Sequence, residues 1–349
     1  MGPLLSILFL VGFAAFFIYL MYLAVQSLIE NRVLSGGDGG ETTRVPYNDA
    51  ATVSQAAELQ RIRLGNGVGI RNLDAKLTSA CLRDVVVKGS YNSAYTGSYM
   101  NLDMITYVLS RGCRFLDFQV FVKDGVPIVG YSQALIDPSF TSLTSLDPPL
   151  SLKGVCDTIM AGAFSDTSPN AGDPLFVQFH IKTNQPSGMD AIANVLHTGL
   201  KNKLHWNAST NAAVEVTPNT RLCDLVGKLV LVVASHTKED QITLDQVTNM
   251  KSGTPNVPIY TESELVSQMY NPAATTSYLL RIVTPTLGYF SGVNNVDSAN
   301  ALEHYSSQVI LEAFYSNDAH LTAYESMFSS SAFLLLSAAI NYIQSKKSI

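Results

Sequence analysis

The chain has 349 residues, enough for one or two soluble domains with a buried core. Only 14% of its residues are charged, its formal net charge is −6, and no run of Lys and Arg exceeds two residues. Such a chain offers no general attraction for phosphate backbones, so the composition argues against a nucleic-acid partner.

The N-terminal stretch has the composition of a membrane span. Residues 1–29 contain no charged side chain, and residues 4–25 are almost wholly apolar. As a helix this apolar stretch covers roughly 33 Å, enough for a hydrocarbon core of about 30 Å. A cleaved signal peptide is the alternative, but it would have a basic start and a shorter apolar core. The sequence therefore predicts a single-pass membrane protein, anchored over residues 1–29 and contacting the bilayer through residues 4–25.

A glycine-rich segment follows the predicted anchor. Residues 35–43 read SGGDGGETT, a composition typical of a flexible linker. Residues 50–63 are predicted to form a short helix, which the glycines at 65 and 67 would end. Residues 30–79 are thus predicted to be a linker and N-terminal extension, and residues 80–349 to be the soluble domain.

In the soluble domain, apolar β-branched runs alternate with longer, more polar stretches. The predicted strands are Val85–Gly89, Phe115–Val122, Val126–Gly130, Leu175–Ile181, Leu229–Ala234, Tyr278–Val283 and Gln308–Tyr315. The predicted helices between them are Leu102–Ser110, Leu152–Met160, Met189–Leu204 and Ser263–Tyr270. The alternation indicates parallel βα units, and this number of strands suits an α/β fold of the (β/α)8 TIM-like barrel type. No glycine-rich nucleotide fingerprint follows the first strand.

In a barrel of this type the chemistry lies at the C-terminal ends of the strands. The segments near those ends are Lys88-Gly89-Ser90-Tyr91-Asn92-Ser93, Gly112-Cys113-Arg114-Phe115-Leu116-Asp117-Phe118-Gln119, Pro127-Ile128-Val129-Gly130-Tyr131-Ser132, Pro174–His180 and Ser307–Tyr315. In this order they resemble the motifs of the phosphatidylinositol-specific phospholipase C family, in particular its X-type catalytic barrel. The resemblance extends over about residues 80–340.

The resemblance implies cleavage of a phosphodiester by two histidines, one after the first strand and one after the third. Imidazole suits this work because it gains and loses a proton near neutral pH. Both matching positions are tyrosine here, Tyr91 and Tyr131. A phenol with a pKa of about 10 is protonated at neutral pH and makes a poor base. The site is therefore predicted to be degenerate, with Tyr91, Tyr131, Asp117 and Arg114 in place of a complete catalytic set.

The resemblance also implies a calcium site in the calcium-dependent members of the family. The positions that match their ligands are Asn92, Asp117, Gln119 and His180. Only one of these is a carboxylate where the family uses three, and Ca²⁺ prefers several charged oxygens. Asn92 and Asp117 are the candidate metal ligands, but neither calcium nor another cofactor is expected.

Other side chains near the strand ends are candidates for substrate binding. Calcium-independent members of the family place a cation at the site, and Arg114 and Lys88 lie near it in the sequence. The candidate substrate-binding residues are Lys88, Gln119, His180 and His236. The six histidines of the chain show no metal-ligand spacing.

Three functions remain open from the sequence. The first is a membrane-anchored, catalytically inactive barrel that binds neighbouring proteins in an assembly, because function belongs to the site and not to the fold. One version of it is a minor capsid protein at the internal membrane of a virion, in a large DNA virus. The second is an active phosphodiesterase on phosphatidylinositol or related head groups, using Asp117, His180 or His236 in altered roles. The third is a non-catalytic head-group receptor.

Overall fold

The computed structural model describes residues 48–63, 68–132, 134–140, 149–217, 219–235, 242–267, 280–288 and 292–347. The chain divides into two compact units, Met1–Asp49 and Ala50–Ile349. The second unit contains the predicted barrel and is described here.

The centre of this unit is a curled sheet. Eight of its eleven strands are parallel and follow the order β10-β11-β14-β1-β2-β5-β8-β9. Their bounds are β1 Val85–Ser90, β2 Phe115–Lys123, β5 Leu175–Ile181, β8 Leu229–Ser235, β9 Met250–Ser252, β10 Ile259–Thr261, β11 Ile282–Thr284 and β14 Val309–Glu312. β1, the first barrel strand along the chain, pairs with β14, the last one. Among the described residues, neighbouring strands around the barrel lack a ladder only between β9 and β10. The fold is therefore mixed α/β, with a nearly closed parallel sheet that fits a TIM barrel.

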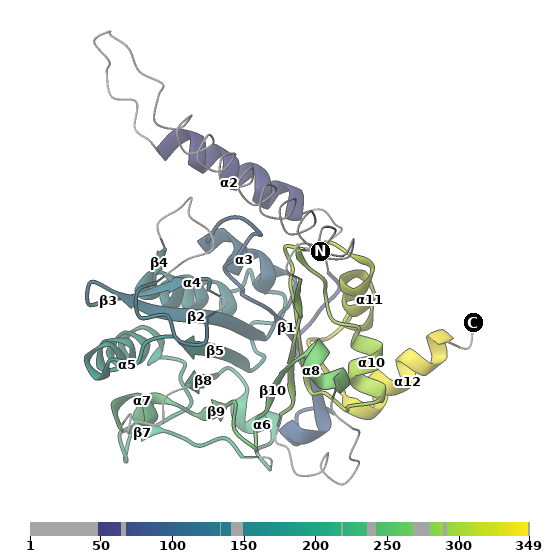
Figure 1. Cartoon of the computed structure of the whole chain (residues 1–349). Helices are drawn as coiled ribbons and strands as arrows, with labels where there is room; N and C mark the ends of the chain where they lie inside the picture. The colour runs from purple at the N-terminus through teal and green to yellow at the C-terminus, as the bar shows by residue number, and fades with distance from the viewer. Residues whose placement is uncertain are drawn as a thin grey trace, which may run out of the picture. The chain divides into compact units, whose positions relative to one another are not determined.

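Helices cover the outside of this sheet. They are α3 Leu102–Ser110, α4 Leu152–Ala163, α5 Pro186–Leu200, α6 Leu222–Leu225, α7 Ile242–Val247, α8 Glu262–Ser267, α10 Ser298–Glu303, α11 Ala319–Met327 and α12 Leu336–Lys347. Figure 1 shows α3, α4 and α5 beside β2 and β5, and α10, α11 and α12 on the other side of β1. Polar N-caps begin several of them: the side chains of Asn101, Ser151 and Asp318 each accept a bond from a backbone N–H in the first turn. The predicted helix Leu102–Ser110 is confirmed with the same bounds.

The remaining elements are short. They are the 3-10 turn Leu82–Asp84 and the strands β3 Val126–Gly130, β4 Leu150–Ser151, β6 Trp206–Asn207, β7 Ala212–Ala213, β12 Leu287–Gly288, β13 Gly292–Val293 and β15 Phe333–Leu335. In the part of the chain that the structure describes, none of the helices combines the length and the apolar character needed to cross a bilayer. The predicted span, residues 4–25, lies outside the described residues.

Strand periodicity separates the inside of the barrel from the outside. On β1, Val85 and Val87 belong to the inner core, whereas Val86 packs against the cluster that contains α10, α11 and α12. On β2, Phe115 faces inward and Leu116 packs toward α3 and α4. Side chains two residues apart on a strand share a face, so this alternation fixes which residues further along each strand reach the interior.

One predicted strand has a different place in the sheet. Val126–Gly130 was expected to be a barrel strand, but β3 is antiparallel to β2 and forms a hairpin with it. The two-residue loop between them is Asp124-Gly125, and both residues have positive φ, 52° and 77°. Asp-Gly is a strong signal for this type of hairpin turn, so the sequence contained the information that corrects the prediction.

Two barrel strands were not predicted. β9 and β10 have three residues each, and their sequences, Met-Lys-Ser and Ile-Tyr-Thr, contain no apolar run. The predicted strand Tyr278–Val283 corresponds to β11, which begins at Ile282; residues 278 and 279 lie outside the described residues. These two strands lie on either side of the opening in the sheet, and each pairs there with one neighbouring barrel strand.

The N-terminal helix α2, Asn48–Ile62, packs on the barrel through its last turns. Leu59 is buried there, and Glu58 Oε2 accepts a bond of 3.0 Å from Thr96 Oγ1 in the loop after β1. The phenol of Tyr107 on α3 donates to the carbonyl of Ile62 at 3.2 Å. The predicted helix over residues 50–63 is confirmed.

A buried acid lies between the sheet and its outer helices. Glu312, at the end of β14, is 0% exposed, and its Oε2 accepts from the backbone N–H of Val296 at 2.9 Å. Its Oε1 has no hydrogen-bond partner among the described residues. Burial raises the pKa of this carboxyl well above its usual value, and the nearby charges of Asp318, Glu262 and Asp297 raise it further.

We expect Glu312→Gln to stabilise the fold at alkaline pH. The raised pKa means that folding favours the protonated acid. The stability contributed by this carboxyl is therefore fully present at low pH and is lost as the pH rises toward its folded-state pKa. Glutamine cannot ionise, so the variant should gain about 1 kcal/mol or more above pH 8 and little near pH 4. Urea unfolding at both pH values, with the exposed Glu215→Gln as a matched control, measures this. An equal effect at both pH values would contradict the prediction.

Candidate functional site

Polar side chains gather on the inner face of β2 and β5 near their C-terminal ends. In the parallel register Asp117 lies opposite Gln178, and Gln119 lies opposite His180. All four continue the inward-facing positions that begin with Phe115 and Phe176. The structure therefore brings together Asp117, Gln119 and His180, as the sequence predicted, and adds Gln178.

Asp117 is the centre of this group. Its carboxylate is 1% exposed, and Oδ1 accepts from Gln178 Nε2 at 2.9 Å and from His180 Nε2 at 2.8 Å. Oδ2 accepts from the backbone N–H of Asn92 at 3.2 Å. Burial opposes ionisation, but the charge and hydrogen bond of His180, with the bonds from Gln178 and Asn92, hold the pKa of Asp117 below its usual value. The group is a buried carboxylate, fixed by three donors.

The loop after β1 is built onto Asp117 through the backbone as well. The N–H of Ser93 donates to the Asp117 carbonyl at 2.8 Å, and the N–H of Asp117 donates to Ser93 Oγ at 2.9 Å. Asn92 adopts a left-handed conformation with φ of 43°, which asparagine tolerates better than most residues. Its Oδ1 accepts from Gln119 Nε2 at 3.4 Å, and Gln119 Oε1 accepts from the N–H of Ser132 at 2.9 Å. The three segments that the sequence associated with the site are thus joined.

Four tyrosines surround this network. Tyr131 stacks on Tyr95 with ring centroids 5.0 Å apart, and Tyr315 meets Tyr95 edge-on at 4.9 Å. Burial raises the pKa of Tyr131 and that of Tyr95 to about 12. The pKa of Tyr91 is also raised, by burial and by the charges of Tyr131 and Asp117. Phenols with such values stay protonated at neutral pH, so they can donate a hydrogen bond but cannot remove a proton.

Two predicted site residues lie elsewhere. Lys88 is fully buried on the outer face of β1, where its Nζ donates to the carbonyl of Arg111 at 2.7 Å and lies 3.6 Å from Glu325 Oε1. Arg114 precedes β2, and its guanidinium donates to the carbonyl of Ala163 at 2.9 Å and to Asn170. Both cations therefore stabilise the fold through these bonds and do not contact Asp117. His236 lies outside the described residues.

The sequence analysis missed a cation that does face the site. Lys182 follows β5 and continues the inward positions of Gln178 and His180, so period-two alternation would have found it. It is 6% exposed, and its Nζ donates to the carbonyl of Ala134 at 2.6 Å. Burial lowers its pKa, while the charges of Asp117 and Asp137 oppose that shift. Tyr95 and Tyr315 were also missed, because they come from loops whose direction only the fold determines.

The residues present do not fit a calcium ion. Asp117 supplies the one carboxylate of the network, and both of its oxygens accept bonds from nitrogen donors. Asn92 Oδ1, the other predicted ligand atom, is taken by Gln119. Across the described residues no cluster of three His, Cys, Asp or Glu side chains has the arrangement of a metal site. A hard divalent cation would have to displace the histidine and the amides before it could bind.

Comparison with solved structures identifies the fold. PLC21 of L. pealei matches with a TM-score of 0.59 at 16% identity, and PLC21 of S. officinalis matches with 0.58 at 15% identity. Each match covers 74% of this chain and 37% of the other protein. The barrel has the phospholipase C-like phosphodiesterase fold. This chain therefore corresponds to little more than a third of those proteins, and no protein-family model or curated protein matches the sequence.

We predict that Asp117→Asn destabilises the phospholipase C-like barrel by roughly 3 kcal/mol at neutral pH, because it replaces a buried carboxylate that accepts three hydrogen bonds by an amide with a single acceptor oxygen. A lowered pKa means that this contribution is present above the ordinary carboxyl pKa and is lost as pH falls through the folded-state value. The difference from the parent chain should therefore shrink near about pH 3. Urea unfolding at the two pH values tests this, with the exposed Asp166→Asn as control. A variant as stable as the parent at neutral pH would contradict it.

Proposed function

We propose that this chain is a membrane-tethered phospholipase C-like barrel that no longer cleaves phosphodiesters and acts by binding a ligand. The observation that carries the proposal is the burial of the phenols of Tyr91 and Tyr131, which stand where the resemblance places the two histidines. Tyr131 is 5% exposed and stacked on Tyr95, and burial raises the pKa of both Tyr131 and Tyr91. Such side chains fill space at the strand ends and offer no base to a substrate hydroxyl. The tether in this proposal is the apolar stretch of residues 4–25.

Unsatisfied polar atoms beside Asp117 support a ligand at this place. Gln178 Oε1 and the hydroxyl of Tyr315 are buried and have no hydrogen-bond partner in the described part of the chain. A buried polar group without a partner costs about 1–3 kcal/mol, so native proteins supply one, as water or as ligand. Together with Lys182 these groups suit a polar head group that carries an anion. That chemistry favours a head-group receptor over a purely structural body, and the capsid version stays a prediction.

A second function is favoured by the pair of Asp117 and His180. The 2.8 Å contact fixes Nε2 of the imidazole on the carboxylate, which leaves Nδ1 as the atom that can exchange a proton. A histidine oriented by a buried acid is an arrangement that general bases use. The alternative is therefore a phosphodiesterase in which His180 acts as the base and Asp117 orients it.

We expect the purified full-length chain, in detergent micelles, to release no inositol phosphate from phosphatidylinositol and no alcohol from glycerophosphodiesters above background. The reason is that buried phenols, Tyr91 and Tyr131, stand at both positions where the resemblance places the acid and the base. Product formation over time measures this.

A control separates true turnover from contamination. His180→Gln and the double variant His180→Gln/His236→Gln remove the histidines that are candidate bases, so activity that survives in the double variant comes from another protein. Turnover that is present in the parent chain and lost in His180→Gln would reject the binding proposal and establish the phosphodiesterase.

The binding proposal itself predicts an interaction with a soluble head group. Glycerophosphoinositol titrated into the detergent-solubilised chain should give saturable heat in calorimetry. Lys182→Met keeps the aliphatic stem and removes the charge, so it should weaken binding about tenfold, the cost of one charge-assisted bond. The exposed Lys201→Met is the matched control and should bind as the parent does. No saturable heat, or equal affinity in both variants, would count against a receptor.

A further inference from the structure

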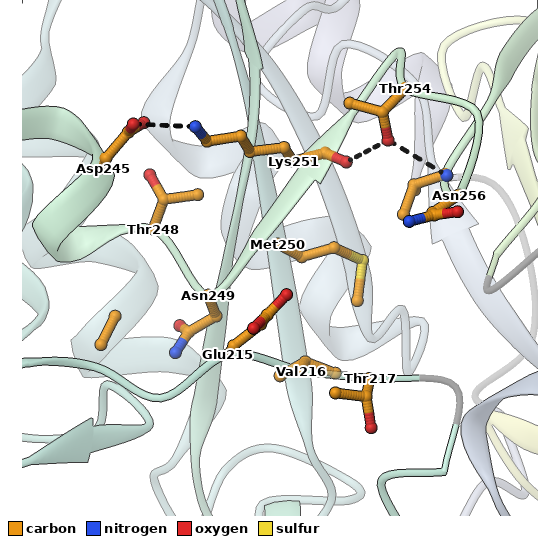
Figure 2. Close-up of a pocket in the computed structure, with 12 residues that line it drawn as sticks. Glu215, Val216, Thr217, Asp245, Thr248, Asn249, Met250, Lys251, Thr254 and Asn256 are labelled. Atoms are coloured by element: carbon orange, nitrogen blue, oxygen red, sulfur yellow. Dashed lines mark hydrogen bonds and ion pairs between the residues drawn. The ribbon is translucent and has the colours of Figure 1, made fainter. Parts of the chain in front are cut away.

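In the part of the chain that the structure describes, a hollow lies on the barrel wall on each side of α7. The larger, about 540 Å³, is lined by the segment before α6, the end of α7 and the β9–β10 turn (Figure 2). Its groups satisfy one another: Lys251 Nζ pairs with Asp245 Oδ2 at 2.8 Å, and Thr254 Oγ1 donates to the carbonyl of Lys251 at 3.1 Å. The buried Asn249 uses its side chain on the backbone of Leu231, His205 and Val214. Nothing in this hollow requires a ligand.

The smaller hollow, about 200 Å³, lies between α5, α7 and the β6–β7 hairpin. Its volume is below the roughly 300–1,000 Å³ typical of sites for drug-sized ligands, so it suits a single small ring. It is lined by Asp190, Asn194, His197, Trp206, Asn211 and Gln246, with Thr243 and two apolar residues. The wall that carries it is separate from the strand ends where Asp117 lies.

An aromatic pair lines the smaller hollow. The rings of His197 and Trp206 lie 4.8 Å apart at an angle of 34°. The two rings give the hollow an aromatic surface beside its polar side chains.

The rim is polar and almost uncharged. Asn194, Asn211 and Gln246 provide amide groups, each of which both donates and accepts. Asp190 Oδ1 accepts from Thr243 Oγ1, a bond that joins α5 to α7, and Oδ2 is the remaining oxygen of that carboxylate. Neither Lys nor Arg lines the hollow, so nothing in it would compensate an anionic ligand.

We propose that this hollow binds one neutral pyranose ring. A sugar presents an apolar face of C–H groups, which an indole covers, and an edge of hydroxyls, which amides and a carboxylate bind as both donors and acceptors. The ligand is either a free monosaccharide or the terminal sugar of a glycan, which share this ring. The proposal is independent of the function proposed for the strand ends.

Trp206 makes the test direct, because it is the one tryptophan of the chain. Its fluorescence, excited where tyrosine does not absorb, is read on the full-length chain in detergent. Glucose, galactose, mannose and N-acetylglucosamine are titrated as methyl glycosides, and then as the terminal residue of short glycans. We expect a saturable change in emission for at least one sugar. Tighter binding of the glycan than of the glycoside identifies a glycan as the source, and equal binding identifies the monosaccharide.

Variants tie the signal to the hollow. Asn194→Ala and Gln246→Ala each remove hydrogen bonds to the ligand, so each should weaken binding about five- to tenfold. Both side chains are exposed, so the fold should tolerate the changes. Asn202→Ala, an exposed asparagine that does not line the hollow, should bind as the parent does. No saturable change with any sugar, or an affinity unaltered in both lining variants, would overturn the proposal.

Discussion

The carboxylate of Asp117 holds the strand ends together. A charge that is 1% exposed inside an apolar barrel is stable only if donors surround it, and here they come from the β1–α3 loop and from β5. Satisfying one group therefore fixes the positions of three segments. The left-handed Asn92 is part of the same constraint, since its N–H must point at the carboxylate while its side chain meets Gln119.

The same constraint limits the chemistry. His180 is held on Asp117, Gln178 is held on Asp117, and the amides of Asn92 and Gln119 bind each other. Groups that in a metal enzyme would face a cation are thus turned toward one another. The tyrosines complete this change, because burial that suits a phenol for packing also keeps it protonated. The proposed function follows from this arrangement, in which fixed donors recognise a polar ligand and no group moves protons.

The sequence predicted the parts of the fold that follow from local pattern. Long apolar strands such as Leu229–Ser235 and capped helices such as Leu102–Ser110 have strong periodic signals, and they were found. The strands β9 and β10 have three residues each and no such signal, because neighbouring strands and not their own composition define them. The hairpin at Asp124-Gly125 was missed although its signal was local, since a barrel with only parallel strands was assumed.

The sequence likewise predicted those site residues whose positions follow from strand alternation and misplaced the others. Asp117, Gln119 and His180 share one face by period-two alternation, and their meeting follows from strand register. Lys88 and Arg114 were misplaced because proximity in sequence says nothing about the face that a side chain takes: Lys88 is one residue from the inward Val87 and so points outward to Glu325. The tyrosine cluster joins the β1–α3 loop, the end of β3 and the end of β14, a contact that no local pattern contains.

Buried polar atoms without partners occur at several places in the described part of this barrel, in structural networks as well as near Asp117 and Trp206. The clamp of Lys88, Arg111 and Glu325 and the network around Asn249 close upon themselves. What sets apart the groups beside Asp117 and beside Trp206 is that each set lies next to side chains that share a ligand chemistry. The two proposed sites differ in charge, with Lys182 at the strand ends and neither Lys nor Arg lining the hollow on the wall, so the two proposals assign an anionic ligand to one site and a neutral ligand to the other.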